Sequence, residues 1–191
     1  MANVSEKFGL RPVRKLDGSP FINAQNRYRI ASGYATAIFQ GDLVTPVAAG
    51  GIERHTANTT NAVVGVFNGV FYTDPTTAKP TWKNYYPGSI TASDIIATVL
   101  DDPDLVSTID SDGAFAAADI FKNFSVTNVT GNTNTGTSKV QLDYSVSGTA
   151  STFVMQAIDI SQNVDNSDAG SANVNVLVRI NNHFYRSGTG L

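Results

Sequence analysis

The residue types that most often carry chemistry are sparse in this sequence. It contains no cysteine, which excludes disulfides, thiolate metal sites and cysteine nucleophiles. Its two histidines, His55 and His183, have no other good ligand beside them in sequence, so a zinc site would need the fold to join both to a carboxylate. We therefore predict no metal site and no cofactor, with His55 in a loop and His183 in a hairpin turn.

The carboxylates gather in turns. They stand at Asp101, Asp102 and Asp104, at Asp110 and Asp112, and at Asp165 and Asp168. Oxygen-rich turns can bind calcium, but the EF-hand spacing, with Gly at position six and Glu at position twelve, is missing. Because Asp is favoured in turns for its own hydrogen bonding, a structural role is the preferred interpretation. A carboxylate pair for glycoside hydrolysis would show only in its spatial separation, and no pair stands out.

Motifs for nucleophilic catalysis and phosphate binding are missing as well. The sequence has no Gly-x-Ser-x-Gly elbow and no Ser-x-x-Lys that opens a helix. It also lacks the P-loop and the dinucleotide-binding pattern. We predict no catalytic residues and a protein that is not an enzyme; a small hydrolase or lyase on a β-sandwich is the alternative that an activity screen against polysaccharides would test.

Aromatic residues supply one pattern that fits ligand binding. A polar segment at 73–88 carries the only tryptophan, Trp82, together with Tyr85 and Tyr86. Such a loop is long enough to be functional. Its aromatic rings would stack on a host-surface glycan or pack under the loop and against a neighbouring subunit, and packing is the favoured interpretation.

The elements that must position these residues have the pattern of strands. Charged residues make up only 15% of the chain, against a usual share of about a quarter, and Thr, Ser, Asn and Gly supply the polar surface instead. Short apolar runs alternate with turn residues, as in a barrel or sandwich. The runs lie at 28–31, 35–39, 43–47, 62–71, 95–100, 105–109, 140–146, 153–160 and 174–180.

Local signals refine this all-β prediction. Asn68-Gly69 between apolar runs predicts a hairpin, because a type I′ turn needs positive φ at both central residues. The Ala-rich stretch 114–121 is the best helix candidate, so we expect at most one or two short helices. No stretch approaches the roughly 20 apolar residues of a membrane span, and the N-terminus lacks the apolar region of a secretory signal, so we expect no membrane partner.

The N-terminal segment differs from the rest in charge and pattern. Residues 1–29 carry six bases and two acids, a net charge of +4, and the remainder carries −7. Apolar residues occur there without helical or strand period. We predict an extended arm at 1–26 that docks on an acidic protein surface, and a body at 27–191 with room for a distal lobe around 127–170. The predicted contact residues are Phe8, Leu10, Arg11, Val13, Arg14, Lys15 and Phe21. Nucleic acid is a less favoured partner, and an arm that wraps its own body is the structural alternative.

Three stretches carry a family resemblance. They are 2–13 (ANVSEKFGLRPV) with 16–20 (LDGSP), 38–44 (IFQGDLV) and 64–67 (VGVF). The first resembles the start of structural proteins from cyanophages and related tailed phages. The other two resemble the Gly-Asp-x-Val and Gly-Val-Phe core of phage capsid decoration, or cement, proteins. The resemblance covers most of the first 125 residues.

This resemblance implies a small β-barrel or β-tulip body that forms a homotrimer and has no active site. It implies a structural virion protein on the outer surface of a bacteriophage capsid, made in the bacterial host cytoplasm, with the major capsid protein as partner. The arm would run along the capsid lattice and bridge neighbouring capsid subunits, without specific binding to nucleic acid. The alternative function is a head-fibre module that binds host-surface glycans.

Overall fold

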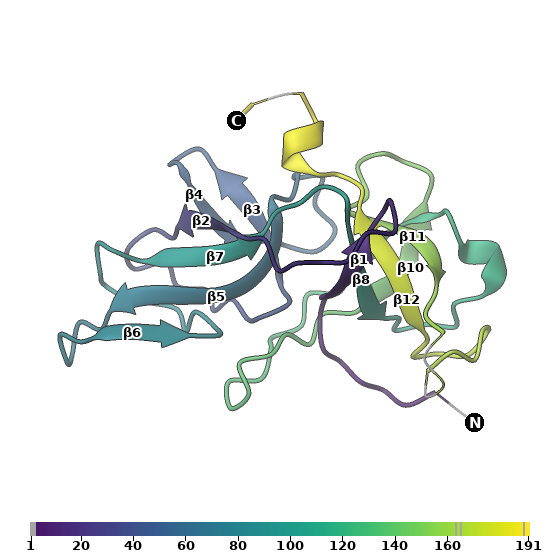
Figure 1. The fold of residues 1–191 in the computed structure, drawn as a ribbon, viewed down its shortest axis with the longest axis horizontal. Coiled ribbons are helices and arrows are strands. Elements are labelled where there is room, and N and C mark those ends of the chain that lie inside the picture. Colours follow the sequence, from purple (N-terminus) through teal and green to yellow (C-terminus); the bar gives the residue numbers. More distant parts are fainter. Residues whose placement is uncertain (1–2, 163, 165, 189) are drawn as a thin grey trace.

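A computed structural model describes residues 3–162, 164, 166–188 and 190–191, and within them the chain is almost entirely strand and loop (Figure 1). Two 3₁₀ turns, η1 (Ala117–Asp119) and η2 (Phe184–Arg186), are the helical elements of this part. The strands are β1 (Arg11–Lys15), β2 (Asn26–Arg29), β3 (Leu43–Val47), β4 (Gly51–Arg54), β5 (Gly65–Thr73), β6 (Pro80–Lys83), β7 (Ile96–Leu100), β8 (Leu105–Asp110), β9 (Asn123–Val126), β10 (Leu142–Gly148), β11 (Met155–Ile160) and β12 (Asn175–Ile180). The all-β prediction is confirmed.

The strands form two antiparallel sheets. Sheet A has the order β1-β8-β12-β11-β9-β10, and sheet B has the order β2-β7-β5-β3-β4, with β6 paired to β5. Among the described residues neither sheet closes on itself, so the body is a pair of open sheets and not a closed barrel. The sheets lie side by side along the long axis of the molecule, with sheet B on the left of Figure 1 and sheet A on the right.

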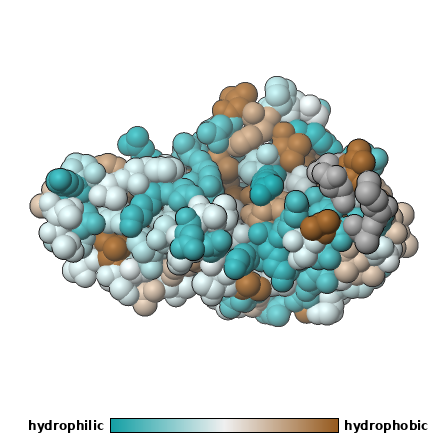
Figure 2. Space-filling model, turned by 90° about the horizontal axis from the view of Figure 1, so that it is seen from below, coloured by the Kyte–Doolittle hydropathy of each residue, from teal (hydrophilic) through white to brown (hydrophobic). Residues whose placement is uncertain are grey.

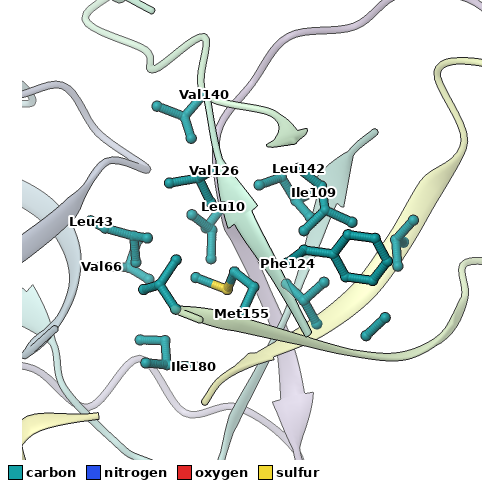
Figure 3. Close-up of a cluster of buried hydrophobic side chains, with 14 of the residues drawn as sticks. Leu10, Leu43, Val66, Ile109, Phe124, Val126, Val140, Leu142, Met155 and Ile180 are labelled. Atoms are coloured by element: carbon teal, nitrogen blue, oxygen red, sulfur yellow. The ribbon is translucent and has the colours of Figure 1, made fainter. Parts of the chain in front are cut away.

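The hydrophobic interior continues from one sheet to the other. The larger cluster is built on sheet A from residues such as Phe124, Leu142 and Met155, and it also takes in Leu43 and Val66 from sheet B (Figure 3). A second cluster lies within sheet B. Because side chains of both sheets share one cluster, separating the sheets would expose apolar area, which costs about 25 cal/mol per Å².

The hairpin predicted at Asn68-Gly69 is wrong, because β5 runs unbroken through both residues. The register against β7 shifts between Phe67 and Gly69, so Asn68 is the extra residue of a β-bulge. Its amide donates to Gln25 at 2.8 Å and its carbonyl accepts from Gln40 at 2.9 Å. The side chain of Asn68 thus forms long-range hydrogen bonds, and Asn68 is not part of a type I′ turn.

Several other sequence predictions are adjusted by the structure. The run at 35–39 is not a strand, and it pairs only through the single bridge between Ile38 and Tyr86. The helix expected at 114–121 shrinks to η1, whose three residues make less than one α-helical turn. Residues 184–185, which follow the last strand, belong to η2.

The Thr/Asn-rich region 127–170 is integrated into the rest of the chain. Its β10 and β11 are strands of sheet A. Its loop reaches the neighbourhood of sheet B, where Asn84 donates to the carbonyl of Thr135 at 2.8 Å and the amide of Gln40 donates to the carbonyl of Gly136 at 3.0 Å. The region considered for a distal lobe therefore links the two sheets.

Candidate interaction surfaces

The three stretches that carry the phage resemblance meet where the two sheets join. The amide of Leu10 donates to the carbonyl of Gly41 at 2.9 Å, and the amide of Gly41 donates to the carbonyl of Phe67 at 2.9 Å. Gly9 (φ +71°) and Gly41 (φ +94°) both have left-handed backbones, which favour glycine. A Cβ on Gly9 would lie 2.5 Å from the Cβ of Ser138, so the N-terminal segment crosses the body in direct backbone contact.

The aspartate of the Gly-Asp-x-Val stretch is a buried anchor. Asp42 accepts from the amide of Phe39 at 2.9 Å and from the hydroxyl of Ser138 at 2.5 Å, and its carboxylate pairs with Nε of Arg54 at 2.9 Å. Arg54 also donates to the carbonyl of Val129 at 2.5 Å. Burial raises the pKa of Asp42, while Arg54 and the two hydrogen bonds oppose that rise. Sequence reasoning missed this network, although a Gly-Asp pair between apolar runs was visible.

The predicted arm lies against its own body in this structure. Phe8 and Leu10 are buried, Leu10 belongs to the larger core cluster, and Phe21 packs against that cluster. β1 pairs antiparallel with β8 at the edge of sheet A. In this conformation Phe8 and Leu10 are not available to fill a partner's grooves, which corrects the idea of a free arm. Phe8, Leu10 and Phe21, which were expected to contact a partner, thus pack against the protein's own core.

The outward side of this segment combines apolar and basic side chains. The residues are Arg11, Val13, Arg14 and Leu16, here called the N-terminal face. Val13 is 49% exposed and Leu16 is 40% exposed. The register of β1 shifts between Pro12 and Arg14, so Val13 is the bulged residue of an edge strand, and bulges of this kind redirect a side chain. The guanidinium of Arg11 stacks over the ring of Phe8, 4.0 Å from its centre, and this contact restrains the arginine side chain.

The acidic turn after β7 holds neighbouring segments in place. Asp102 pairs with Lys15 at 2.8 Å, and Asp104 pairs with Arg186. Asp101 accepts from the amide of Asn26 at 2.9 Å and from the hydroxyl of Tyr28. Part of the positive charge of the N-terminal segment, at Lys15, is therefore matched within the chain itself.

Two other aspartates that were considered as calcium ligands, Asp112 and Asp168, also have partners within the chain. Asp112 accepts from the amide of Tyr144 at 2.8 Å, and the backbone of Asp168 exchanges hydrogen bonds with Asn3. Asp165 lies outside the described residues. No group of three or more His, Asp or Glu side chains that could hold a metal ion occurs in the part of the chain that the structure describes.

The three aromatic residues proposed for glycan or subunit contact fall into different environments. Tyr86 is fully buried, and its hydroxyl donates to the carbonyl of Tyr34 at 2.8 Å. Tyr85 stacks on Phe39 with 5.5 Å between ring centres. Trp82 is 60% exposed. Of these three side chains, only Trp82 offers an open aromatic surface, which it shares with Phe71, a residue that sequence reasoning did not select.

Both histidines are interior residues. Nδ1 of His55 lies 2.9 Å from the hydroxyl of Thr45, and Nδ1 of His183 accepts from the amide of Tyr185 at 3.2 Å. Nε2 of each ring is buried without a hydrogen-bond partner among the described residues. Burial lowers the pKa of His55 to about 4 and also lowers the pKa of His183. Both rings are therefore neutral in the folded protein at pH 7, and their placement gives them a packing role.

Asp110, at the end of β8, is fully buried. Gln141 donates to Oδ2 at 2.9 Å, while Oδ1 has no partner among the described residues. Asn175 stands directly opposite on β12, and its own Oδ1 is likewise buried and unpartnered. Burial raises the pKa of Asp110 to about 6, against hydrogen bonding from Gln141 and from the backbone of Glu6.

The surface gives no single large apolar face in the view of Figure 2. Most of that face is hydrophilic or near neutral, and hydrophobic residues appear as separate spots. None of the helical elements among the described residues is long or apolar enough to cross a bilayer. A partner that contacts the face seen in Figure 2 would therefore meet separate small apolar patches.

The fold and these surfaces define an all-β protein of two joined antiparallel sheets. Comparison of the chain with protein-family models, with curated proteins and with solved structures found no match.

Proposed function

We propose that this chain is a structural, non-enzymatic capsid decoration protein that binds the outer surface of a tailed-phage head and bridges neighbouring major capsid proteins. The observation that carries the proposal is the N-terminal face. Two exposed apolar side chains, Val13 and Leu16, lie there in one short segment with Arg11 and Arg14, at and just after the edge strand β1. A surface of this kind suits a permanent protein partner, because apolar area supplies affinity and arginine pairs with carboxylates bidentately.

The proposal also draws on the meeting of the three phage-like stretches at one junction. Gly9, Gly41 and Phe67 are in contact there through backbone hydrogen bonds and close packing. The resemblance thus falls on residues that fix the N-terminal face to the body. A face held rigidly loses less conformational entropy on binding than a free arm would, and this favours tight attachment.

Trimerisation would strengthen attachment further. Each face of a homotrimer would bind the capsid with an effective concentration set by the faces already seated. We expect a solution mass three times the chain mass of 20.2 kDa, measured by light scattering.

The decisive experiment uses purified heads that lack their decoration protein. Wild-type protein should co-sediment with expanded heads, and Val13→Glu combined with Leu16→Glu should reduce occupancy at least tenfold, because the two carboxylates replace the apolar area of the contact and compete with capsid carboxylates for Arg11 and Arg14. Phe121→Glu, which changes another exposed apolar residue, serves as the matched control and should bind as the wild type does. Circular dichroism would verify that all three proteins are folded.

Full occupancy by the Val13→Glu, Leu16→Glu protein would refute the assignment of the N-terminal face. Failure of the wild type to bind any expanded head of its own phage would refute the decoration function itself. Deleting the whole segment is a poorer test, because Leu10 belongs to the core.

A further inference from the structure

The solvent-facing side of sheet B carries an aromatic row flanked by arginines. The register places Trp82 of β6 opposite Phe71 of β5, Phe71 opposite Ile96 of β7, and Ile96 opposite Arg29 of β2. Directly opposed residues of antiparallel strands share one face of a sheet. Phe71 is 43% exposed, so this row presents two open aromatic rings to solvent.

Gly69 has no side chain, and this leaves room for the indole of Trp82 to lie against the sheet. Gly69 lies two residues before Phe71 on the same face, and a Cβ on it would lie 2.8 Å from Cζ2 of Trp82. The ring therefore rests against the backbone of β5, while 60% of the side chain remains exposed. Such a ring is fixed before any ligand arrives, so binding would cost little side-chain entropy.

The next row supplies positive charge and polar groups. Gly69 faces Thr98 of β7, and Thr98 faces Arg27 of β2. Arg27 and Arg29 are exposed, and neither guanidinium forms an ion pair or hydrogen bond with the residues that the structure describes. The nearby carboxylate of Asp94 is already held by Thr73, whose hydroxyl donates to it at 2.7 Å.

These residues line a groove of about 530 Å³, a volume usual for a small-molecule site. Its lining residues are Arg27, Phe71, Trp82, Asp94, Ile96 and Thr98. We propose that this groove, which we call the sheet B groove, binds an acidic saccharide. A sugar ring would stack on the indole of Trp82, and a sugar carboxylate would pair with the free guanidinium of Arg27 in the groove and with that of Arg29, which stands opposite Ile96 at its border.

Charge selects this ligand class over the other possible occupants. A second copy of the chain would bring two more arginines and one more carboxylate, that of Asp94, to the contact, so two of the four guanidinium groups would be buried without a carboxylate. Nucleic acid needs many phosphate contacts for useful affinity, and a face with two arginines on a chain of net charge −3 supplies few. One or two sugar carboxylates match two guanidinium groups.

The test uses the fluorescence of Trp82, which is the only tryptophan and so reports on this groove alone. Trigalacturonate is the probe, and its methyl ester, which has the same rings without charge, is the matched control ligand. We expect a saturable change in emission with the acid, and binding at least tenfold weaker with the ester. The charge-assisted hydrogen bonds between guanidinium and carboxylate, which the ester cannot form, underlie this expectation.

Variants separate stacking from charge. Arg27→Gln with Arg29→Gln should weaken trigalacturonate binding at least tenfold, whereas the control Arg186→Gln should leave it unchanged. Trp82→Ala should abolish trigalacturonate binding, measured by calorimetry because this variant has lost its tryptophan. Equal affinity for the ester, unchanged affinity in the double arginine variant, or no saturable signal up to about 20 mM ligand would each overturn the proposal. Binding of a hexaglutamate peptide in place of the saccharide would overturn the ligand class. None of these outcomes depends on capsid binding through the N-terminal face.

Discussion

Replacing Asp110 by Asn should stabilise the protein, and the gain should grow with pH. The carboxyl group is fully buried, and its pKa is raised from 3.8 to about 6. The folded state therefore holds this proton more tightly than the unfolded chain does. As pH rises from about 4 to about 6 the unfolded chain releases the proton first, so the free energy of unfolding falls, and above about 6 the folded state carries the whole penalty.

The size of the effect follows from the two pKa values. The penalty is about 1 kcal/mol at pH 4.5 and about 3 kcal/mol at pH 8. Asn has nearly the same shape and no charge, and its amide can donate toward the unpartnered Oδ1 of Asn175 on the opposite strand. At about 2–4 °C per kcal/mol for a chain of this size, Asp110→Asn should raise Tm by about 6–12 °C at pH 8.

Thermal and urea unfolding followed by far-UV circular dichroism between pH 4.5 and pH 8 would measure this, since the largely exposed Trp82 is a weak reporter of unfolding. The lowered pKa values of the histidines act in the opposite sense, because stability is lost as pH falls through 6.5, but they are common to both proteins and cancel in the difference.

Two controls test the assignment of this effect to charge. Asp110→Ala should show the same pH slope relative to wild type, displaced downward by a constant packing loss. Asp74→Asn should act in the opposite direction, because hydrogen bonds from the amides of Thr76 and Thr77 lower the pKa of Asp74. A Tm difference for Asp110→Asn that does not change with pH, or a less stable Asp110→Asn protein at pH 8, would refute the reasoning.

Two further substitutions test a buried ion pair and a close packing contact. Arg54→Met should cost about 3–5 kcal/mol in urea unfolding because it leaves a buried carboxylate without its partner, whereas Arg186→Met, at an exposed pair, should cost less than about 1 kcal/mol; equal losses would contradict the distinction. Gly69→Ala should displace the indole of Trp82 and shift its emission to longer wavelength, because the new Cβ would lie 2.8 Å from the ring. Gly190→Ala, with open space around it, should leave the spectrum unchanged, and an unchanged spectrum in Gly69→Ala would show that the ring is not held there.

The strand content could be predicted from the sequence because alternation and β-branched residues act locally. The run at 43–47 coincides with β3, and the alternating run at 174–180 contains β12. The failures share a cause, which is that long-range contacts overrode local preference. The side chain of Asn68 bonds to Gln25 and Gln40, 43 and 28 positions away along the chain, instead of forming a turn. Within 114–121 only η1 is helical, and it contacts β11 of sheet A.

The sites were harder to predict because side-chain direction depends on register. Phe8 and Val13 are both apolar residues of one segment, yet the pairing of β1 with β8 accompanies the burial of one and the exposure of the other. In the same way, the link between Trp82 and Phe71 rests on a register that no local pattern specifies. The arginines of both surfaces were visible in the sequence, but it could not show that Arg11 stacks on Phe8 while Arg27 and Arg29 have no side-chain partner among the described residues.

The N-terminal segment packs against residues that are far away in the sequence, and this has a consequence for folding during translation. The side chain of Asn3 donates to the carbonyl of Ala172, which lies 169 positions later in the chain. Likewise, β1 cannot pair until β8 has been synthesised. At roughly 5–20 residues per second, translation separates Asn3 from this partner by about 8 to 34 seconds. Sheet B can assemble during that interval, while sheet A cannot be completed until β12 has left the ribosome. Nascent-chain experiments should therefore find the two sheets becoming protease-resistant at different chain lengths.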